Sequence, residues 1–184
     1  MTVLTLDRPV ILDTCVLINL LASGEAEAIL RSLGVNCQVC TAVRRESMYL
    51  RSETLPGQRE ARDLSPLFIS EVLHLCDLQG QAEEGLYVGY AADLDDGEAM
   101  SLAISQSRGY CLATDDRKTR KLARETGLNI VLLTTTEILR IWAELNAPAP
   151  AKLATAIQRI SNRARFVPSP EDPNYSWWQA NSKS

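Results

Sequence analysis

Carboxylic acids placed just beyond short apolar segments are the feature that most limits the folds open to this chain. They occur at four places: Asp13, Glu46, Glu98 and the adjacent pair Asp115 and Asp116. Asp13, for example, directly follows residues 10–12, an apolar run typical of a fully buried strand. Residues beyond the carboxyl ends of parallel strands meet in one crevice, where ligands usually bind. Carboxylates gathered there repel one another unless a hard cation neutralises them, and oxygen-only sites suit Mg²⁺ or Mn²⁺. The pattern therefore predicts a metal-dependent phosphodiesterase.

Strand-like and helix-like segments alternate from Val10 to Asn146. The apolar runs predict strands over residues 10–12, 35–40, 72–78, 110–114 and 130–133. Helical spacing, caps and breakers predict helices over residues 14–21, 25–33, 41–51, 59–70, 81–92, 95–107, 117–126 and 134–146. This alternation predicts an α/β domain over residues 1–146, with a central, mainly parallel sheet flanked by helices.

Residues 147–184 read as a C-terminal extension. A proline-containing hinge over 147–150 precedes an amphipathic helix predicted for 151–165, and a tail with three prolines follows. Trp177 and Trp178 lie in this tail. If exposed, they could anchor a protein partner; the alternatives are packing back on the domain or disorder.

Composition indicates an ordinary globular protein outside the membrane. Of 184 residues, 46% are hydrophobic and 23% charged, which is typical of soluble domains. No apolar run is long enough to span a bilayer, and residues 1–9 lack the layout of a signal peptide, so we expect a cytoplasmic protein. The net charge of −4 does not favour a simple electrostatic nucleic-acid binder. It does not exclude a nuclease, because metal-binding acids lower the total.

Positive charge is concentrated directly after the acidic pair. The predicted helix 117–126 carries several basic residues, among them Arg117, Lys118, Arg120 and Lys121. They form either a solvated helix surface or a surface that binds RNA phosphates or an acidic partner.

The cysteine pattern favours buried thiols. Five cysteines in a chain without a secretory signal argue against a disulfide framework. Cys37 and Cys40 have the spacing of half a zinc site, which His74 and Cys76 could complete, but both pairs lie in strand-like segments rather than on turns. His74 is the single histidine, which weakens a nucleophilic triad as an explanation.

Each acid also has a purely structural explanation. Asp13 could cap the helix after it, Glu98 could form a reciprocal cap with Asp95, and Asp115 or Asp116 could cap the helix that begins at Arg117. Caps do not explain Glu46, which we place a full turn inside the helix entered from Thr41. The coincidence of all four acids favours function.

The same acids lie in segments that resemble the motifs of PIN-domain ribonucleases. Residues 10–14 (VILDT) resemble the strand that delivers the first metal-binding aspartate, here Asp13. Residues 39–46 (VCTAVRRE) resemble a strand and a helix with an inward glutamate, here Glu46.

The later motifs follow in the same order. Residues 95–99 (DDGEA) are similar to the Gly-Glu-Ala motif of the VapC-like toxin subgroup, in which the glutamate, here Glu98, stands in for the third acid. Residues 112–117 (LATDDR) resemble the Thr-x-Asp signature, which favours Asp116 over Asp115 as the ligand. The order and separations fit across residues 10–145. The chain departs from the pattern by continuing for nearly forty residues beyond the last motif helix.

The resemblance implies a three-layer PIN-like fold and a ribonuclease that cleaves single-stranded RNA. It implies catalytic acids Asp13, Glu46, Glu98 and Asp116, with Asp115 as an alternative metal ligand, around Mg²⁺ or Mn²⁺. Thr14, Asn19 and Thr114 would orient carboxylates or water. Stand-alone members are most often toxins of toxin–antitoxin pairs, so a homodimer and an antitoxin partner are expected.

Three alternatives remain at this point. One is a PIN nuclease of RNA processing or repair, and another is a PIN-like interaction module without catalysis. The third is an aspartyl phosphatase that uses Asp13, which is weakened because Cys15 stands where those enzymes need a second aspartate.

Overall fold

Five short parallel strands form the central sheet of the protein. The computed structural model describes residues 6–46, 48–55 and 57–183. The strands are ordered β5-β2-β1-β6-β7, and each neighbouring pair is parallel. Their bounds are β1 (Val10–Leu12), β2 (Cys37–Cys40), β5 (His74–Cys76), β6 (Cys111–Ala113) and β7 (Leu132–Leu133). The predicted α/β fold with a parallel sheet is confirmed.

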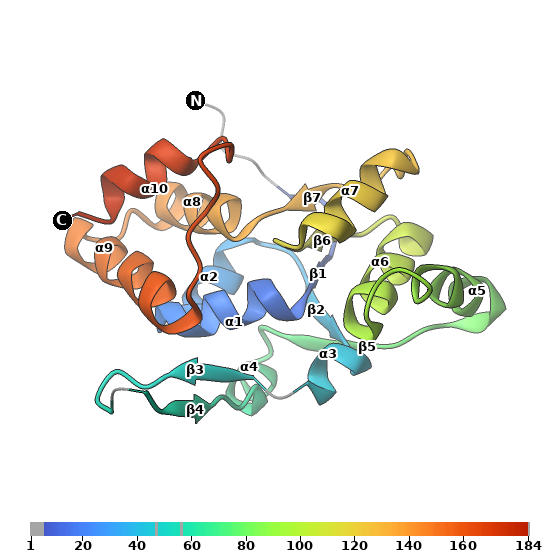
Figure 1. The fold of residues 1–184 in the computed structure, drawn as a ribbon, viewed down its shortest axis with the longest axis horizontal. Helices are drawn as coiled ribbons and strands as arrows, with labels where there is room; N and C mark the ends of the chain where they lie inside the picture. The colour runs from blue at the N-terminus through green and yellow to red at the C-terminus, as the bar shows by residue number, and fades with distance from the viewer. Residues whose placement is uncertain (1–5, 47, 56, 184) are drawn as a thin grey trace.

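Helices cover both faces of this sheet, which makes three layers (Figure 1). One layer contains α1 (Thr14–Ser23), α2 (Ala26–Ser32), α8 (Thr135–Asn146) and α9 (Pro150–Arg159), which contact one another. The other contains α3 (Thr41–Arg45), α5 (Gly80–Tyr90) and α6 (Asp96–Arg108), with α6 against β1, β2 and β6. The remaining helices before the C-terminal segment are α4 (Ser65–Ile69) and α7 (Arg117–Glu125). None of the helices in the described part of the chain is long and apolar enough to cross a membrane.

The core explains why the sequence of β1 carries no polar residue. Val10, Ile11 and Leu12 are fully buried, because a central parallel strand is covered by helices on both faces. Trp142 of α8, in the helical layer that contains α1 and α2, is also buried. Strand β1 lies between β2 and β6, so the chain leaves all three strands at the same edge of the sheet.

A hairpin replaces the helix that the sequence predicted after α3. Helix α3 ends at Arg45, and Glu46 has extended backbone angles (φ −69°, ψ 138°). Strands β3 (Tyr49–Arg51) and β4 (Arg59–Ala61) then pair in antiparallel fashion. The prediction of a helix to residue 51 and of another from residue 59 was therefore wrong. The side chains of β3 alternate between exposed and buried, with Leu50 buried between two exposed residues. This two-residue period is that of a strand and not of a helix.

The C-terminal segment folds back over the first layer. Helix α9 and the π-helical turn η1 (Ile160–Ala164) pack against α1, and α10 (Tyr175–Asn181) packs against α9. Trp178 of α10 is 3% exposed and meets the Phe166 ring edge-on at 5.7 Å between centroids. Trp177 is partly buried against the same core. The exposure that a partner anchor requires is therefore absent at Trp178. The predicted division at residue 146 stays a prediction.

Trp178 gives a test of this packing. Replacing a buried tryptophan with alanine removes its contacts and leaves a cavity, so Trp178→Ala should lower the free energy of unfolding by about 3 kcal/mol. Trp177→Ala, at the partly buried neighbouring position, should lower the free energy of unfolding by clearly less than Trp178→Ala does. Urea unfolding of both variants measures the difference. A Trp178→Ala protein as stable as wild type would contradict the structure of the C-terminal segment.

Candidate active site

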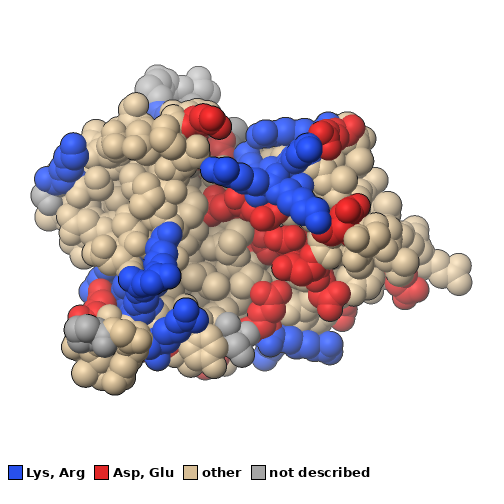
Figure 2. Space-filling view, in the orientation of Figure 1, with Lys and Arg blue, Asp and Glu red and all other residues tan. Residues whose placement is uncertain are grey.

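Acids from four elements converge at the carboxyl edge of the sheet. Asp13 follows β1 and Asp116 follows β6, the neighbouring strand, while Glu46 follows α3 and Glu98 lies in the first turn of α6. The strand order reverses direction between β1 and β6, which is where open α/β sheets usually bind ligands. Figure 2 shows Asp and Glu side chains gathered in the middle of one face of the molecule. We call the set Asp13, Glu46, Asp95, Glu98 and Asp116 the acidic cluster.

Asp13 is the most firmly held member of the cluster. It caps α1, accepting from the Thr14 amide at 2.7 Å on Oδ1. On Oδ2 it accepts from the Thr114 hydroxyl at 2.8 Å and the Cys15 thiol at 3.2 Å. Burial raises the pKa of Asp13, which is 3% exposed, and these hydrogen bonds offset part of that rise. Asp13 is therefore both a cap and a fixed carboxylate of the cluster.

Glu46 reaches the cluster from the end of α3 rather than from inside a helix. The sequence placed it a full turn within a longer helix, and this was wrong, because the backbone turns extended at Glu46 itself. Its carboxylate lies against the backbone of Gly97, at the start of α6. A Cβ atom at Gly97 would collide with Glu46 Oε1 and would lie 3.3 Å from Val43 Cγ2. Glycine at position 97 thus leaves room for the Glu46 carboxylate, which a side chain there would push aside.

Glu98 carries the largest electrostatic perturbation in the cluster. Burial, together with the charges of Asp116, Asp95 and Asp13, raises the pKa of Glu98 to about 7. Asp95 caps α6, accepting from the Glu98 amide at 3.4 Å, and its charge also raises the pKa values of Asp13 and Glu46. Sequence reasoning treated Asp95 only as a cap. Its position two residues before Gly97 of the Gly-Glu-Ala segment was the signal that could have placed it in the site.

The two adjacent aspartates after β6 point in different directions. Asp116 caps α7, with Thr119 N–H donating to Oδ1 at 2.7 Å, and its charge acts on Glu98. The Asp115 carboxylate instead accepts from the Thr135 amide at 2.9 Å, the Thr135 hydroxyl at 2.5 Å and Asn19 Nδ2 at 3.0 Å. Asp115 therefore holds α8 and α1 together, and the structure brings Asp116 rather than Asp115 into the cluster.

The three polar residues expected to support the acids take different positions. Thr114 is fully buried and orients Asp13 directly, whereas Asn19 bonds to Asp115 and Thr135. Thr14 lies near enough to Glu46 to offset part of the rise that burial causes in the pKa of that carboxyl. Its buried hydroxyl nevertheless meets no partner at full hydrogen-bond geometry among the described residues.

The acidic cluster has no positive partner of its own. Among the described residues, none of its five carboxylates forms an ion pair with Lys, Arg or His. Like charges held together without a counter-charge favour binding of a cation. The donors are all oxygens, and the Thr14 hydroxyl adds another beside Glu46. This donor chemistry fits a hard divalent ion such as Mg²⁺ or Mn²⁺.

The arrangement is open rather than closed around one point. In the described part of the chain, no three His, Cys, Asp or Glu side chains are grouped closely enough to hold a metal ion directly. That also leaves the zinc alternative without a site, because the thiols of Cys37 and Cys40 are buried against main-chain oxygens. Mg²⁺ commonly keeps several of its waters and binds through one or two carboxylates, which suits an open cluster.

The basic residues after Asp116 are not one uniform surface. Arg120 donates to the carbonyls of Thr114 and Leu133 at 3.1 and 3.3 Å, so it ties α7 to the ends of β6 and β7. Lys118 donates to the carbonyl of Asp93, and Lys121 forms an exposed ion pair with Glu125. Arg117 is exposed and has no ion pair with a described residue, so it is the member freest to meet a ligand.

Comparison with known proteins gives one finding that bears on this site. The family model described as DUF3368: PIN domain matches residues 9–170. That range contains the whole sheet and the acidic cluster, together with α9 and η1. No curated protein and no solved structure matches the chain.

The raised pKa of Glu98 predicts how stability depends on pH in the metal-free protein. A carboxyl whose folded-state pKa is raised stabilises the fold below about pH 4.5 and loses this contribution as pH rises through about 7. Glu98→Gln, which stays neutral, should therefore match wild type near pH 4 and exceed it at pH 8. At pH 8 we expect the free energy of unfolding of Glu98→Gln to exceed that of wild type by about 1–2 kcal/mol, a value reduced for solvent screening of a partly exposed group.

Thermal unfolding in EDTA at the two pH values measures this difference. Glu84→Gln, at an exposed position in α5, is the matched control and should show no pH-dependent gain. The same difference between Glu98→Gln and wild type at both pH values would mean that Glu98 is not perturbed by its neighbours.

Proposed function

Because the chain belongs to the PIN-domain family, whose members are generally metal-dependent nucleases, we propose that it hydrolyses phosphodiester bonds of single-stranded RNA. The observation that carries this proposal is the acidic cluster. Its carboxylates raise one another's pKa values at the carboxyl edge of the sheet and have no cationic partner among the described residues.

Asp13, Glu46, Glu98 and Asp116 would hold the ion, directly or through its waters. When bound, Mg²⁺ or Mn²⁺ supplies neutralising charge and activates water for attack on the phosphodiester. Two caps keep their carboxylates in fixed orientations, Asp13 on α1 and Asp116 on α7, so little rearrangement is needed when the ion arrives. Thr114 supports both, since its hydroxyl donates to Asp13 and accepts from the Asp116 amide.

Among the described residues, the thiol that lies beside Asp13 is not suited to act as a covalent nucleophile. Burial, with the charges of Asp13 and Asp115, raises the pKa of the Cys15 thiol far above its usual range. Cys15 therefore stays protonated and donates its hydrogen to Asp13. The attacking group is then water, and the role of Cys15 is to orient Asp13.

Cleavage of a labelled single-stranded RNA tests the proposal. We expect activity with Mg²⁺ or Mn²⁺ and none in EDTA. Asp13→Asn and Asp116→Asn should each reduce the rate by at least about 100-fold, because a carboxylate that binds the ion is lost. Asparagine also caps helices, so these variants should fold.

The matched control is Asp63→Asn. Asp63 accepts from the Ser65 amide at 2.9 Å, as a capping aspartate does, but it lies outside the acidic cluster. Its variant should retain wild-type activity. Equal cleavage by wild type and both site variants would attribute the activity to a contaminant and reject the site.

We further propose that the protein is the toxin of a type II toxin–antitoxin pair, acting as a homodimer. One support is the Gly-Glu-Ala segment, which resembles the motif of the toxin subgroup. The other is that the carboxylates lie together on one face of the molecule, where an arginine or lysine of an antitoxin could neutralise them (Figure 2).

Expression in a bacterial host separates this role from other nuclease roles. The wild-type chain should arrest growth, and Asp13→Asn should restore it at equal protein level. Co-expression with a cognate antitoxin should also restore growth. Cleavage in vitro without growth arrest would favour RNA processing or repair instead.

A further inference from the structure

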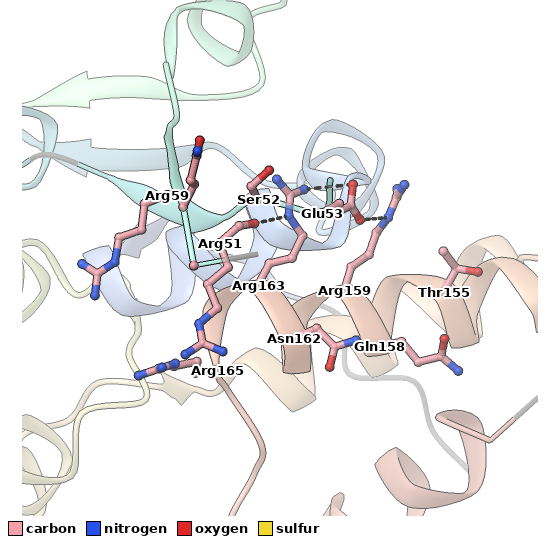
Figure 3. Close-up of a pocket in the computed structure, with 12 residues that line it drawn as sticks. Arg51, Ser52, Glu53, Arg59, Thr155, Gln158, Arg159, Asn162, Arg163 and Arg165 are labelled. Atoms are coloured by element: carbon pink, nitrogen blue, oxygen red, sulfur yellow. Dashed lines mark hydrogen bonds and ion pairs between the residues drawn. The ribbon is translucent and has the colours of Figure 1, made fainter. Parts of the chain in front are cut away.

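A polar cavity lies between the β3–β4 hairpin and the end of α9. Its volume is about 840 Å³. Figure 3 shows arginines from the hairpin and from α9–η1 pointing into this space. Five arginines line it: Arg51, Arg59, Arg159, Arg163 and Arg165.

Two of the five arginines build the cavity. Arg163 is 7% exposed, donates to the Arg51 carbonyl at 3.0 Å and pairs with Glu60 at 2.9 Å. Arg159 pairs with Glu53 at 2.9 Å. These contacts join the hairpin to residues more than a hundred positions later in the chain, so the shape of the cavity is fixed by tertiary structure.

The other three arginines have no counter-charge. Arg51, Arg59 and Arg165 are exposed and form no ion pair with a described residue. Arg51 and Arg59 are direct cross-strand partners, an arrangement that is unfavourable for like charges. Arg165 follows the π-helical turn and has φ +60°, a conformation that non-glycine residues rarely adopt. We call these three residues the arginine groove.

The chemistry of the arginine groove favours phosphates over a protein surface. Guanidinium groups match the geometry of phosphate oxygens and form strong, charge-assisted hydrogen bonds with them. Among the described residues, no apolar or aromatic side chain lines the cavity, so these residues do not form the apolar pocket that a protein partner would fill with an anchoring side chain. Contacts of this kind hold a nucleic-acid backbone without reading its bases.

Strand β3 connects the arginine groove to the acidic cluster. Glu46 and Arg51 are five residues apart, so their Cα atoms are separated by at most about 19 Å. Tyr49 lies between them on the same face of β3 as Arg51 and is 49% exposed, available for a base to stack on. Figure 2 shows Lys and Arg side chains over the hairpin and the end of α9 on the face that carries the acids.

We propose that the arginine groove binds the phosphodiester backbone of the RNA strand as it leads into the acidic cluster. This inference rests on the proposed ribonuclease function and adds a substrate-binding subsite built by the hairpin and the C-terminal segment. The groove holds RNA by charge, a few nucleotides from the scissile bond, and is not part of the catalytic site.

Binding measured without metal separates the groove from catalysis. Fluorescence anisotropy in EDTA follows a labelled single-stranded RNA with wild type, with Arg51→Gln/Arg59→Gln and with Arg8→Gln/Arg31→Gln. The control pair removes the same charge from two exposed positions whose ion partners are also exposed, which contribute little to stability.

The groove variant should bind about tenfold more weakly, and its slope of log K against log salt should fall by about 1.4, from two lost phosphate contacts. The control should stay within about twofold of wild type. Arg51→Lys/Arg59→Lys keeps both charges and should recover most of the binding. The melting temperature of the groove variant should not fall, because two like charges that face each other have been removed.

Two outcomes reject the proposal. Wild-type affinity and salt slope in the groove variant would show that RNA does not use the groove. The same result, with loss of a co-purifying protein from the groove variant alone, would assign the surface to a protein partner instead. Absence of cleavage with intact, groove-dependent RNA binding would reject only the proposed activity and leave the subsite standing.

Discussion

Repulsion among carboxylates at one edge of a parallel sheet is the constraint on which the rest of this structure depends. Strand β1 pairs with β2 and β6, so the chain must release Asp13 and Asp116 beside each other. Glu98 and Asp95 are brought to the same place by the first turn of α6, which packs across these strands. Two unit charges 4 Å apart near a protein surface repel by about 4 kcal/mol. Such a cost is tolerable only where neighbours or a cation offset it.

Hydrogen bonds from neighbouring residues offset part of this repulsion but do not abolish it. Caps at α1, α6 and α7 place backbone N–H groups on Asp13, Asp95 and Asp116, and the positive end of each helix further favours a carboxylate there. A backbone hydrogen bond from Asp95 also lowers the pKa of Glu98, but burial and the neighbouring charges outweigh it and raise that pKa to about 7. Capping and function are therefore not competing explanations for these acids. The cap fixes each carboxylate, and the convergence of several capped carboxylates makes the site.

The sequence predicted the fold well because the signals for it are local. Apolar runs, caps and turn residues alternate along the chain, and a short buried strand such as β1 admits one interpretation. The prediction from sequence failed where a short segment is compatible with both the helical and the strand period. Residues 49–51 can be read as the end of the predicted helix, but in the structure their side chains alternate between exposed and buried, as in a strand. The Thr-x-Asp pattern favoured Asp116 over Asp115 but could not show the reason, which is that Asp115 bonds to Thr135 and so turns away. The burial of Trp178 likewise depends on Phe166 and the fold of the C-terminal segment.

Charge distribution explains why a negative net charge is compatible with the proposed binding of RNA. The total of −4 averages the acidic cluster with basic groups that flank it on the same face, over α7 and over the hairpin and α9 (Figure 2). Under the proposed function, an RNA strand would meet these regions separately, because salt screens charges beyond about 8 Å. Cations such as Arg51 and Arg117 would then attract the strand before a phosphate reaches the acids. The acids would repel that phosphate until a divalent ion is bound, so the basic flanks would hold the substrate and the ion would control its entry.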